Sequence, residues 1–288
     1  MGNSLRDVKN RMIATQKTSQ ITKAMNMVSA SKLRRAEKKY VEYQSYMKQL
    51  DDILVNIVSS GEKFEHPMLN NREVKKVGYL VITSDRGLAG PYNSSVLKAL
   101  SNDILTRNLK ESDFVVGAIG SKGYAYCKKK GYNMLNTNPM FVRDDISFLD
   151  CSEFVRQFIK MYEEKEIDSL IVCFNHHINT LSQEVTLKQI LPIQEVSKDT
   201  EIKCDYEFDQ GVEKSLDMIL PMYVENVLYG LILDAKTSEH ASRMTAMKSA
   251  TDNADKVIET LRLQYNRSRQ SAITNEIIDI VGGAQAVS

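Results

Sequence analysis

Two stretches near opposite ends of the chain repeat their inward-facing residues at alternating steps of three and four. The first runs from Leu33 to Ile57 and the second from Met244 to Tyr265. This spacing keeps one face in line along a long helix that supercoils with a partner. The members are Leu33, Ala36, Tyr40, Tyr43, Met47, Leu50, Leu54 and Ile57, and then Met244, Met247, Thr251, Ala254, Ile258, Leu261 and Tyr265. Stripes so far apart in the sequence meet only if the chain folds back, so we predict an antiparallel coiled coil with a globular head between its helices.

The two predicted helices differ in length and in the strength of their stripes. The first should run from about Ser4 to Val58, roughly 80 Å, and the last from about Gly211 nearly to the end, about 105 Å. The longer helix should therefore project beyond its partner as a single apolar helix. The first half of the N-terminal helix carries small polar residues where a strong coiled coil would have Leu. These residues are Thr15, Thr18, Ser19 and Thr22.

The segment between the long helices alternates strand and helix patterns. Short apolar runs predict buried strands at 77–83, 114–119 and 169–174, and an alternating run predicts an edge strand at 184–191. Helix patterns cover 92–106, the stretch that ends at Lys130, and 152–164. This order predicts an α/β fold with long helices, in which a Rossmann-like, mainly parallel sheet forms the central domain. We expect a helix over 1–58, a linker over 59–74, the central α/β domain over 75–205 and the second helix over 206–288.

Charge and composition narrow the classes of partner. The formal net charge of the whole chain is +1, so we expect no nucleic-acid partner. Residues 1–48 nevertheless hold eleven basic and three acidic side chains, a net +8 that favours an acidic protein partner. The chain contains no run of eighteen apolar residues, and its N-terminus lacks the apolar core of a secretory signal. We therefore expect no span of its own through a membrane.

Few features of the sequence suggest chemistry. Gly87–Gly90 and Gly117–Gly123 follow predicted strands, but neither has the spacing of a phosphate-binding loop, so both are interpreted as structural turns. His176 and His177 follow a predicted strand end without further ligands at metal-site spacing, and are interpreted as loop histidines. The four cysteines are scattered. We expect no metal, no cofactor and no catalytic constellation.

Three segments together resemble the γ subunit of the F-type rotary ATP synthase. The first is Ile21–Ala36, and the second is Ile82–Asn93 with its Ser-Asp-Arg-Gly-Leu-Ala-Gly core. The third combines Ser238–Met247, Ala250–Ala254 and Tyr265–Thr274. The resemblance covers both long helices and the order of the elements between them, which is essentially the whole chain.

The resemblance implies a non-catalytic central-stalk rotor in a proton-translocating ATP synthase. In that family the paired helices stand within a ring of α and β subunits, and the α/β head forms a foot on the ε subunit and the membrane-embedded c ring. Rotation of the c ring then drives the catalytic β subunits through their states. We expect one copy per complex, peripheral attachment through the c ring alone, and a place on the cytoplasmic face of a bacterial cell membrane.

The resemblance also assigns contact residues by position. Lys23 and Met25 match the segment near the moving, acidic lever of the β subunit, and Arg243 matches the basic residue that faces it from the other helix. Arg269 and Gln270 match the pair at the catch loop of the β subunit, with Thr274 one turn further. The expected c-ring foot is Tyr206, Glu207 and Asp209, a short motif that departs from the family pattern at Phe208 and Gln210.

Two other functions remain open from the sequence. A structural coiled-coil adaptor with a globular head would explain the long helices and predicts a homodimer. A nucleotide-dependent enzyme built on the central sheet would explain the α/β segment and predicts nucleotide binding by the chain alone.

Overall fold

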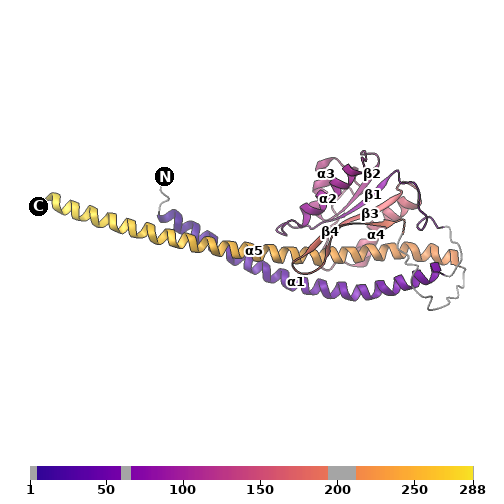
Figure 1. Ribbon diagram of the computed structural model, residues 1–288, viewed down its shortest axis with the longest axis horizontal. Coiled ribbons are helices and arrows are strands. Elements are labelled where there is room, and N and C mark those ends of the chain that lie inside the picture. The colour runs from indigo at the N-terminus through magenta and orange to yellow at the C-terminus, as the bar shows by residue number, and fades with distance from the viewer. Residues whose placement is uncertain (1–4, 60–65, 194–211, 288) are drawn as a thin grey trace. The chain divides into compact units, whose positions relative to one another are not determined.

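A computed structural model describes residues 5–59, 66–193 and 212–287. The chain divides into two compact units, each described here by itself. One joins residues 1–29 with 244–288, and the other comprises residues 30–243. Two helices contribute to both units: α1, Leu5–Ser59, and α5, Val212–Val287 (Figure 1). Both long helices predicted from the stripes are therefore confirmed.

In the first unit α1 and α5 pack as an antiparallel pair. Ser19 Oγ donates to Asp255 Oδ1 at 2.8 Å, and the hydroxyls of Thr22 and Thr251 lie 2.7 Å apart, so the pairing runs in opposite directions along the two helices. The predicted stripe of α5 faces inward: Met247, Ala254 and Leu261 are buried. On the α1 side the buried face contains Val8, Thr22 and Ser29, which makes this interface narrow and partly polar.

The C-terminal turns of α5 extend past the start of α1. The pairing of Ser19 with Asp255 and of Thr22 with Thr251 places Leu5 opposite about residue 268. Beyond that point the apolar side chains of α5 are exposed, namely Ile273, Ile277, Ile278, Ile280 and Val281. A single helix with exposed isoleucines is the arrangement that the sequence predicted, and Figure 1 shows its projection past the N-terminal end.

The second unit is built on a four-stranded mixed sheet with the order β2-β1-β3-β4. β1, Val77–Ile82, pairs in parallel with β2, Phe114–Ile119, and with β3, Ser169–His177. β4, Gln183–Leu191, returns antiparallel to β3 at the edge of this order. The prediction of a mainly parallel sheet with one edge strand at 184–191 is confirmed.

Helices cover both faces of the sheet. α2, Tyr92–Thr106, and α3, Ser121–Lys130, pack on one face over a core that includes Tyr79, Val81 and Ile171. α4, Phe148–Glu163, packs on the other face together with the long helices (Figure 1). The second core therefore joins the sheet to both long helices, and its members on the long helices include Leu54, Ile57, Leu220, Val224 and Leu228.

We call the sheet with α2, α3 and α4 the head. Two elements of the head differ from the sequence prediction. α4 begins at Phe148 rather than at residue 152, because Ser147 accepts a hydrogen bond from the Asp150 amide and the Asp150 carboxylate accepts one in return. This capping box adds a turn that the apolar pattern alone did not indicate. His176 and His177 belong to β3, where they pair with Glu184 and Gln183 of β4, and are not loop residues. The hairpin pairing extends β3 past its apolar run.

The chain that leads into β1 packs against the head. Met68 is fully buried in the core, and its carbonyl accepts a 2.7 Å bond from the Ile193 amide. Arg72 Nε lies 2.9 Å from Asp168 Oδ1, and its guanidinium stacks 4.1 Å from the Tyr162 ring centre. Residues 66–76 are thus held in place, whereas the predicted domain boundaries at 58, 74 and 205 remain predictions.

Within the described residues, one helix is long and apolar enough to cross a membrane by length and composition. It lies in α5 between Lys214 and Ala284, and half of its most apolar window is buried inside the structure. The sequence predicts no such segment, because it contains no uninterrupted run of eighteen apolar residues. A core helix with scattered polar residues meets the same criterion, so this observation is weak support for a membrane span.

Candidate functional site

Most of the predicted contact residues lie on the surface of the first unit. Lys23, Arg269, Gln270 and Thr274 are exposed, and Met25 is half-buried. Thr274 Oγ1 donates to the Gln270 carbonyl one turn earlier. These side chains are available to a partner.

The structure does not gather these contact residues into one cluster. The helix pairing places Lys23 opposite about residue 250 of α5. At 1.5 Å per residue, that point lies about 30 Å along α5 from Arg269. The predicted contacts therefore form two separate groups on this unit. The foot residues Tyr206, Glu207 and Asp209 lie outside the described residues.

Arg243 occupies a different environment, inside the second unit. Only 11% of its side chain is exposed. Its Nη2 lies 2.8 Å from Glu239 Oε1 and donates to the Arg86 carbonyl at 3.3 Å. This contact brings together two of the segments that carry the family resemblance, 82–93 and 238–247. Arg243 thus fastens α5 to a turn of the head.

A run of polar residues on α5 is buried around Arg243. Within residues 234–243 every side chain has low exposure, and these include Asp234, Lys236, Glu239 and His240. A buried charge is costly unless it is paired. Each of these charges has a partner: Lys236 Nζ lies 3.1 Å from Glu239 Oε2, and Asp234 accepts from the His177 amide at 2.8 Å and contacts His176 Nδ1 at 2.6 Å.

A five-residue segment between α3 and α4 reaches both long helices at this point. We call residues 142–146 the strap. Its Asp144 carboxylate lies 2.6 Å from Lys32 Nζ on α1, and 3.4 Å and 3.2 Å from Lys236 Nζ and His240 Nε2 on α5. One carboxylate therefore joins three basic side chains from two helices.

The surroundings of Asp144 and His240 shift the pKa values of both groups. Burial acts to raise the pKa of Asp144, but the hydrogen bond from Lys32 and the charges of Lys236 and His240 outweigh it and lower the pKa to about 2. Burial lowers the pKa of His240 to about 4. The Asp144 carboxylate is therefore charged and the His240 imidazole neutral at pH 7.

The two glycine-containing turns hold protein groups at the start of α3. Thr83 Oγ1 accepts from the Gly123 amide at 2.8 Å, and Asp85 Oδ1 accepts from the Ser121 amide at 3.0 Å. In a phosphate-binding loop such amides would point to the ligand. A Cβ on Gly120, whose φ is +92°, would lie 2.1 Å from the Thr83 carbonyl oxygen. The glycines here permit close packing of the head on itself.

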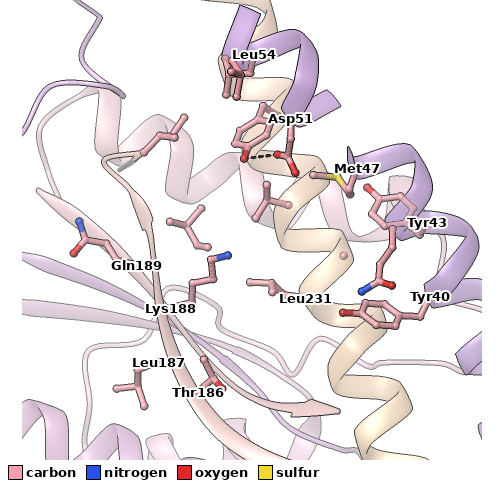
Figure 2. A pocket seen from close by; sticks show the side chains of 17 residues that line it. Tyr40, Tyr43, Met47, Asp51, Leu54, Thr186, Leu187, Lys188, Gln189 and Leu231 are labelled. Carbon is pink, nitrogen blue, oxygen red and sulfur yellow. Dashed lines mark hydrogen bonds between the residues drawn. The ribbon is translucent and has the colours of Figure 1, made fainter. Parts of the chain in front are cut away.

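A groove separates β4 from the long helices along part of their length. It has a volume of about 940 Å³ and is lined by α1, β4 and α5. Figure 2 shows Tyr40, Tyr43 and Asp51 of α1 facing Lys188 of β4 across it. Tyr223 OH donates to Asp51 Oδ1 at 2.8 Å and ties α5 to α1 on this side. Over the described ranges, no group of three or more His, Cys, Asp and Glu side chains could hold a metal ion.

The sequence prediction did not single out Asp144 or its three basic partners Lys32, Lys236 and His240. Asp144 sits in a loop with no recognisable pattern, and Lys236 and His240 interrupt an apolar stripe. One signal in the sequence was the polar run Lys236–Arg243, which follows the apolar positions between Leu216 and Leu233, since charges on the inner face of a helix require partners.

Comparison with known proteins establishes the family to which this chain belongs. A family model described as ATP synthase matches residues 4–287. The chain belongs to the γ family of ATP synthase. It is therefore a central-stalk subunit of an ATP synthase, a complex associated with a membrane.

Solved structures share the fold of this γ-family chain. A chain from the central stalk and c ring of the Tetrahymena thermophila mitochondrial ATP synthase aligns with a TM-score of 0.60 and 22% identity, over 80% of this chain and 99% of that one. A chain from the rotor of the Euglena gracilis mitochondrial ATP synthase aligns with a TM-score of 0.67 and 16% identity, over 93% and 98%. At these identities the likeness establishes the fold alone, with two long helices and a sheet domain between them.

Proposed function

We propose that this chain is the rotor shaft of a bacterial, proton-translocating ATP synthase, which couples rotation of a c ring to conformational cycling of catalytic β subunits. One copy would serve each complex, with the α, β and ε subunits and the c ring as partners. It would lie on the cytoplasmic face of the cell membrane and touch the membrane only through the c ring.

The observation that carries this proposal is the form of the first unit. α5 continues past α1 as a single helix with exposed isoleucines, among them Ile273, Ile277 and Ile280. Exposed apolar surface of this kind calls for a covering partner. A ring of subunits around the helix tip would supply such a cover while leaving the helix free to turn.

The surface of this unit also fits a sliding contact. Lys23, Arg269, Gln270 and Thr274 are exposed, and Lys23 belongs to the strongly basic first 48 residues. We assign Lys23, Met25, Arg269, Gln270 and Thr274 to contacts with acidic or polar segments of the surrounding subunits.

Arg243 and the three foot residues are proposed as contacts on the family resemblance alone. Arg243 is retained as a predicted contact, although its guanidinium is already bonded to Glu239 and to the Arg86 carbonyl. Tyr206, Glu207 and Asp209 are proposed as the foot on the c ring.

We propose no catalytic role for the chain itself. The amides at the start of α3 are bonded to Thr83 and Asp85, which supports a structural use of the turns that most resemble phosphate loops. The purified chain should hydrolyse no ATP, and native mass measurement of the complex should find a single copy, whereas the adaptor alternative requires a homodimer.

The test compares two arginines on α5 in the reconstituted complex. A guanidinium holds a carboxylate with two parallel bonds, which an ammonium group does not reproduce. Arg269→Ala should lower ATP hydrolysis or assembly, Arg269→Lys should be intermediate, and Arg262→Ala, at an exposed arginine two turns earlier, should match the wild type. If Arg269→Ala and Arg262→Ala gave equal ATP hydrolysis and assembly, the assigned contact of Arg269 would be refuted. If the wild-type chain failed to assemble with α and β, the proposed function itself would be refuted.

A further inference from the structure

The strap is fixed to the head at both of its ends. The Val142 amide donates to Asp85 Oδ2 at 2.8 Å, and the side chains of Val142 and Ile146 are buried in the core. Directly after the strap, Ser147 caps α4. A displacement of the strap would therefore move the head with it.

Both long helices bind the strap through its backbone as well as through Asp144. From α1, Lys39 Nζ donates to the Ile146 carbonyl at 2.8 Å. From α5, Tyr229 OH donates to the same carbonyl at 3.0 Å, and Lys236 Nζ donates to the Val142 carbonyl at 2.8 Å. Together with the contacts of the Asp144 carboxylate, these hydrogen bonds connect the strap to each of the two long helices.

We propose that the strap is the torque-bearing tie between the head and the two long helices, and that Asp144 is its principal positioning residue. This proposal rests on the rotor function proposed above. No bond to a partner subunit is involved, since every group belongs to this chain.

The physical argument concerns the kind of contact that resists twisting. Apolar packing depends on buried area and has no preferred direction, so it opposes separation of head and helices better than sliding between them. Hydrogen bonds weaken steeply when their distance or angle changes. A tie that must keep two surfaces in angular register therefore requires directed bonds. The backbone carbonyls of the strap accept three hydrogen bonds from the helices, and its Asp144 carboxylate adds a hydrogen bond from Lys32 and close contacts with Lys236 and His240.

Cavities beside the strap and beside β4 leave room for the head and the long helices to move relative to each other if the contacts of the strap are lost. A cavity of about 240 Å³ lies beside the strap and is lined by Lys32, Arg35, Lys39 and Asp145 among others. On the side of β4 the 940 Å³ groove separates the edge strand from the helices (Figure 2). Without the Asp144 carboxylate, Lys32 and the strap have space into which they can move.

The experiment uses the complete reconstituted complex in vesicles. Three variants are compared with the wild type: Asp144→Asn removes the charge, Asp144→Glu preserves it, and Asp145→Asn removes the exposed neighbouring carboxylate as a matched control. Protons pumped per ATP hydrolysed are measured while the opposing proton gradient rises, together with complex yield and melting of the full chain.

We expect Asp144→Asn to match the wild type at low opposing gradient and to fall to less than half of its pumping ratio at high gradient. Asp144→Glu should recover most of the ratio, and Asp145→Asn should equal the wild type throughout. A role in folding alone would lower melting or yield while the assembled complexes kept a normal ratio at every gradient, and that result would overturn the proposal. Uncoupled pumping or failed assembly by the wild-type chain would instead refute the rotor function.

Discussion

His240 should make the stability of this protein fall as the pH drops below neutrality. The side chain is 3% exposed, and burial lowers its pKa from 6.5 to about 4. The groups facing it are Lys236, Glu239 and Arg243 on α5 and Asp144 in the strap. In the part of the chain that the structure describes, Nδ1 has no hydrogen-bond partner, so a proton placed there would be unsatisfied.

The sign and size of the effect follow from proton linkage. Between pH 6.5 and pH 4 the unfolded chain binds a proton at His240 and the folded chain does not, so stability is lost as the pH falls through this window. Each pH unit corresponds to about 1.4 kcal/mol, so the loss is about 2 kcal/mol by pH 5 and about 3 kcal/mol by pH 4. For a unit of this size, 2 kcal/mol lowers the melting temperature by roughly 4–8 °C.

The assay is thermal unfolding of the full chain, followed by circular dichroism at pH 7.5 and pH 5. His240→Gln keeps an amide near the position of Nε2 but has no titrating group. The wild type should lose about 2 kcal/mol more than this variant between the two pH values. Equal losses in both proteins would show that His240 is accessible to protons in the folded state, and the reasoning from burial would be wrong.

Four further substitutions test the packing of the head and helices by the same melting assay. Gly120→Ala should lower the free energy of unfolding by more than about 2 kcal/mol, because the new Cβ would meet the Thr83 carbonyl. Gly131→Ala, at a positive φ with open space around it, should lower it by about 1 kcal/mol, and the reverse order would contradict the geometry. Leu54→Ala removes a side chain that is 2% exposed and should cost about 2–5 kcal/mol, while a cost below 1 kcal/mol would argue against the shared core. Thr83→Val leaves the Gly123 amide without its acceptor and should cost about 1–3 kcal/mol, and a neutral result would show that this amide finds another partner.

The long helices and the sheet were predictable because their signals are local and periodic. Burial of Met247, Ala254 and Leu261 follows the three-four spacing, since each turn of a helix returns to the same face. β1, β2 and β3 follow from short apolar runs between turn residues, and β4 from its alternation. The capping box at Ser147 was also legible in the sequence, but it was overlooked because the apolar pattern starts later.

For the candidate site, too, the sequence predicted what depends on local pattern and missed what depends on distant contacts. Exposure of Lys23, Arg269 and Thr274 agrees with positions off the inward stripe, and their assignment to partner contacts remains a prediction from the family resemblance. The sequence assigned Arg243 to a partner, while the fold bonds it to Glu239 and to the carbonyl of Arg86, 157 positions away in the chain. No local pattern indicates which distant carbonyl will receive a side chain.

What the sequence determined by itself is therefore the set of elements, their order and the family, because each depends on residues close together in the chain or on long motifs. Only the tertiary structure decided that Asp144 ties Lys32 on one helix to Lys236 and His240 on the other. These four residues are spread over more than 200 positions, and the buried charge of Lys236 is acceptable only after folding has brought its acidic partners to it.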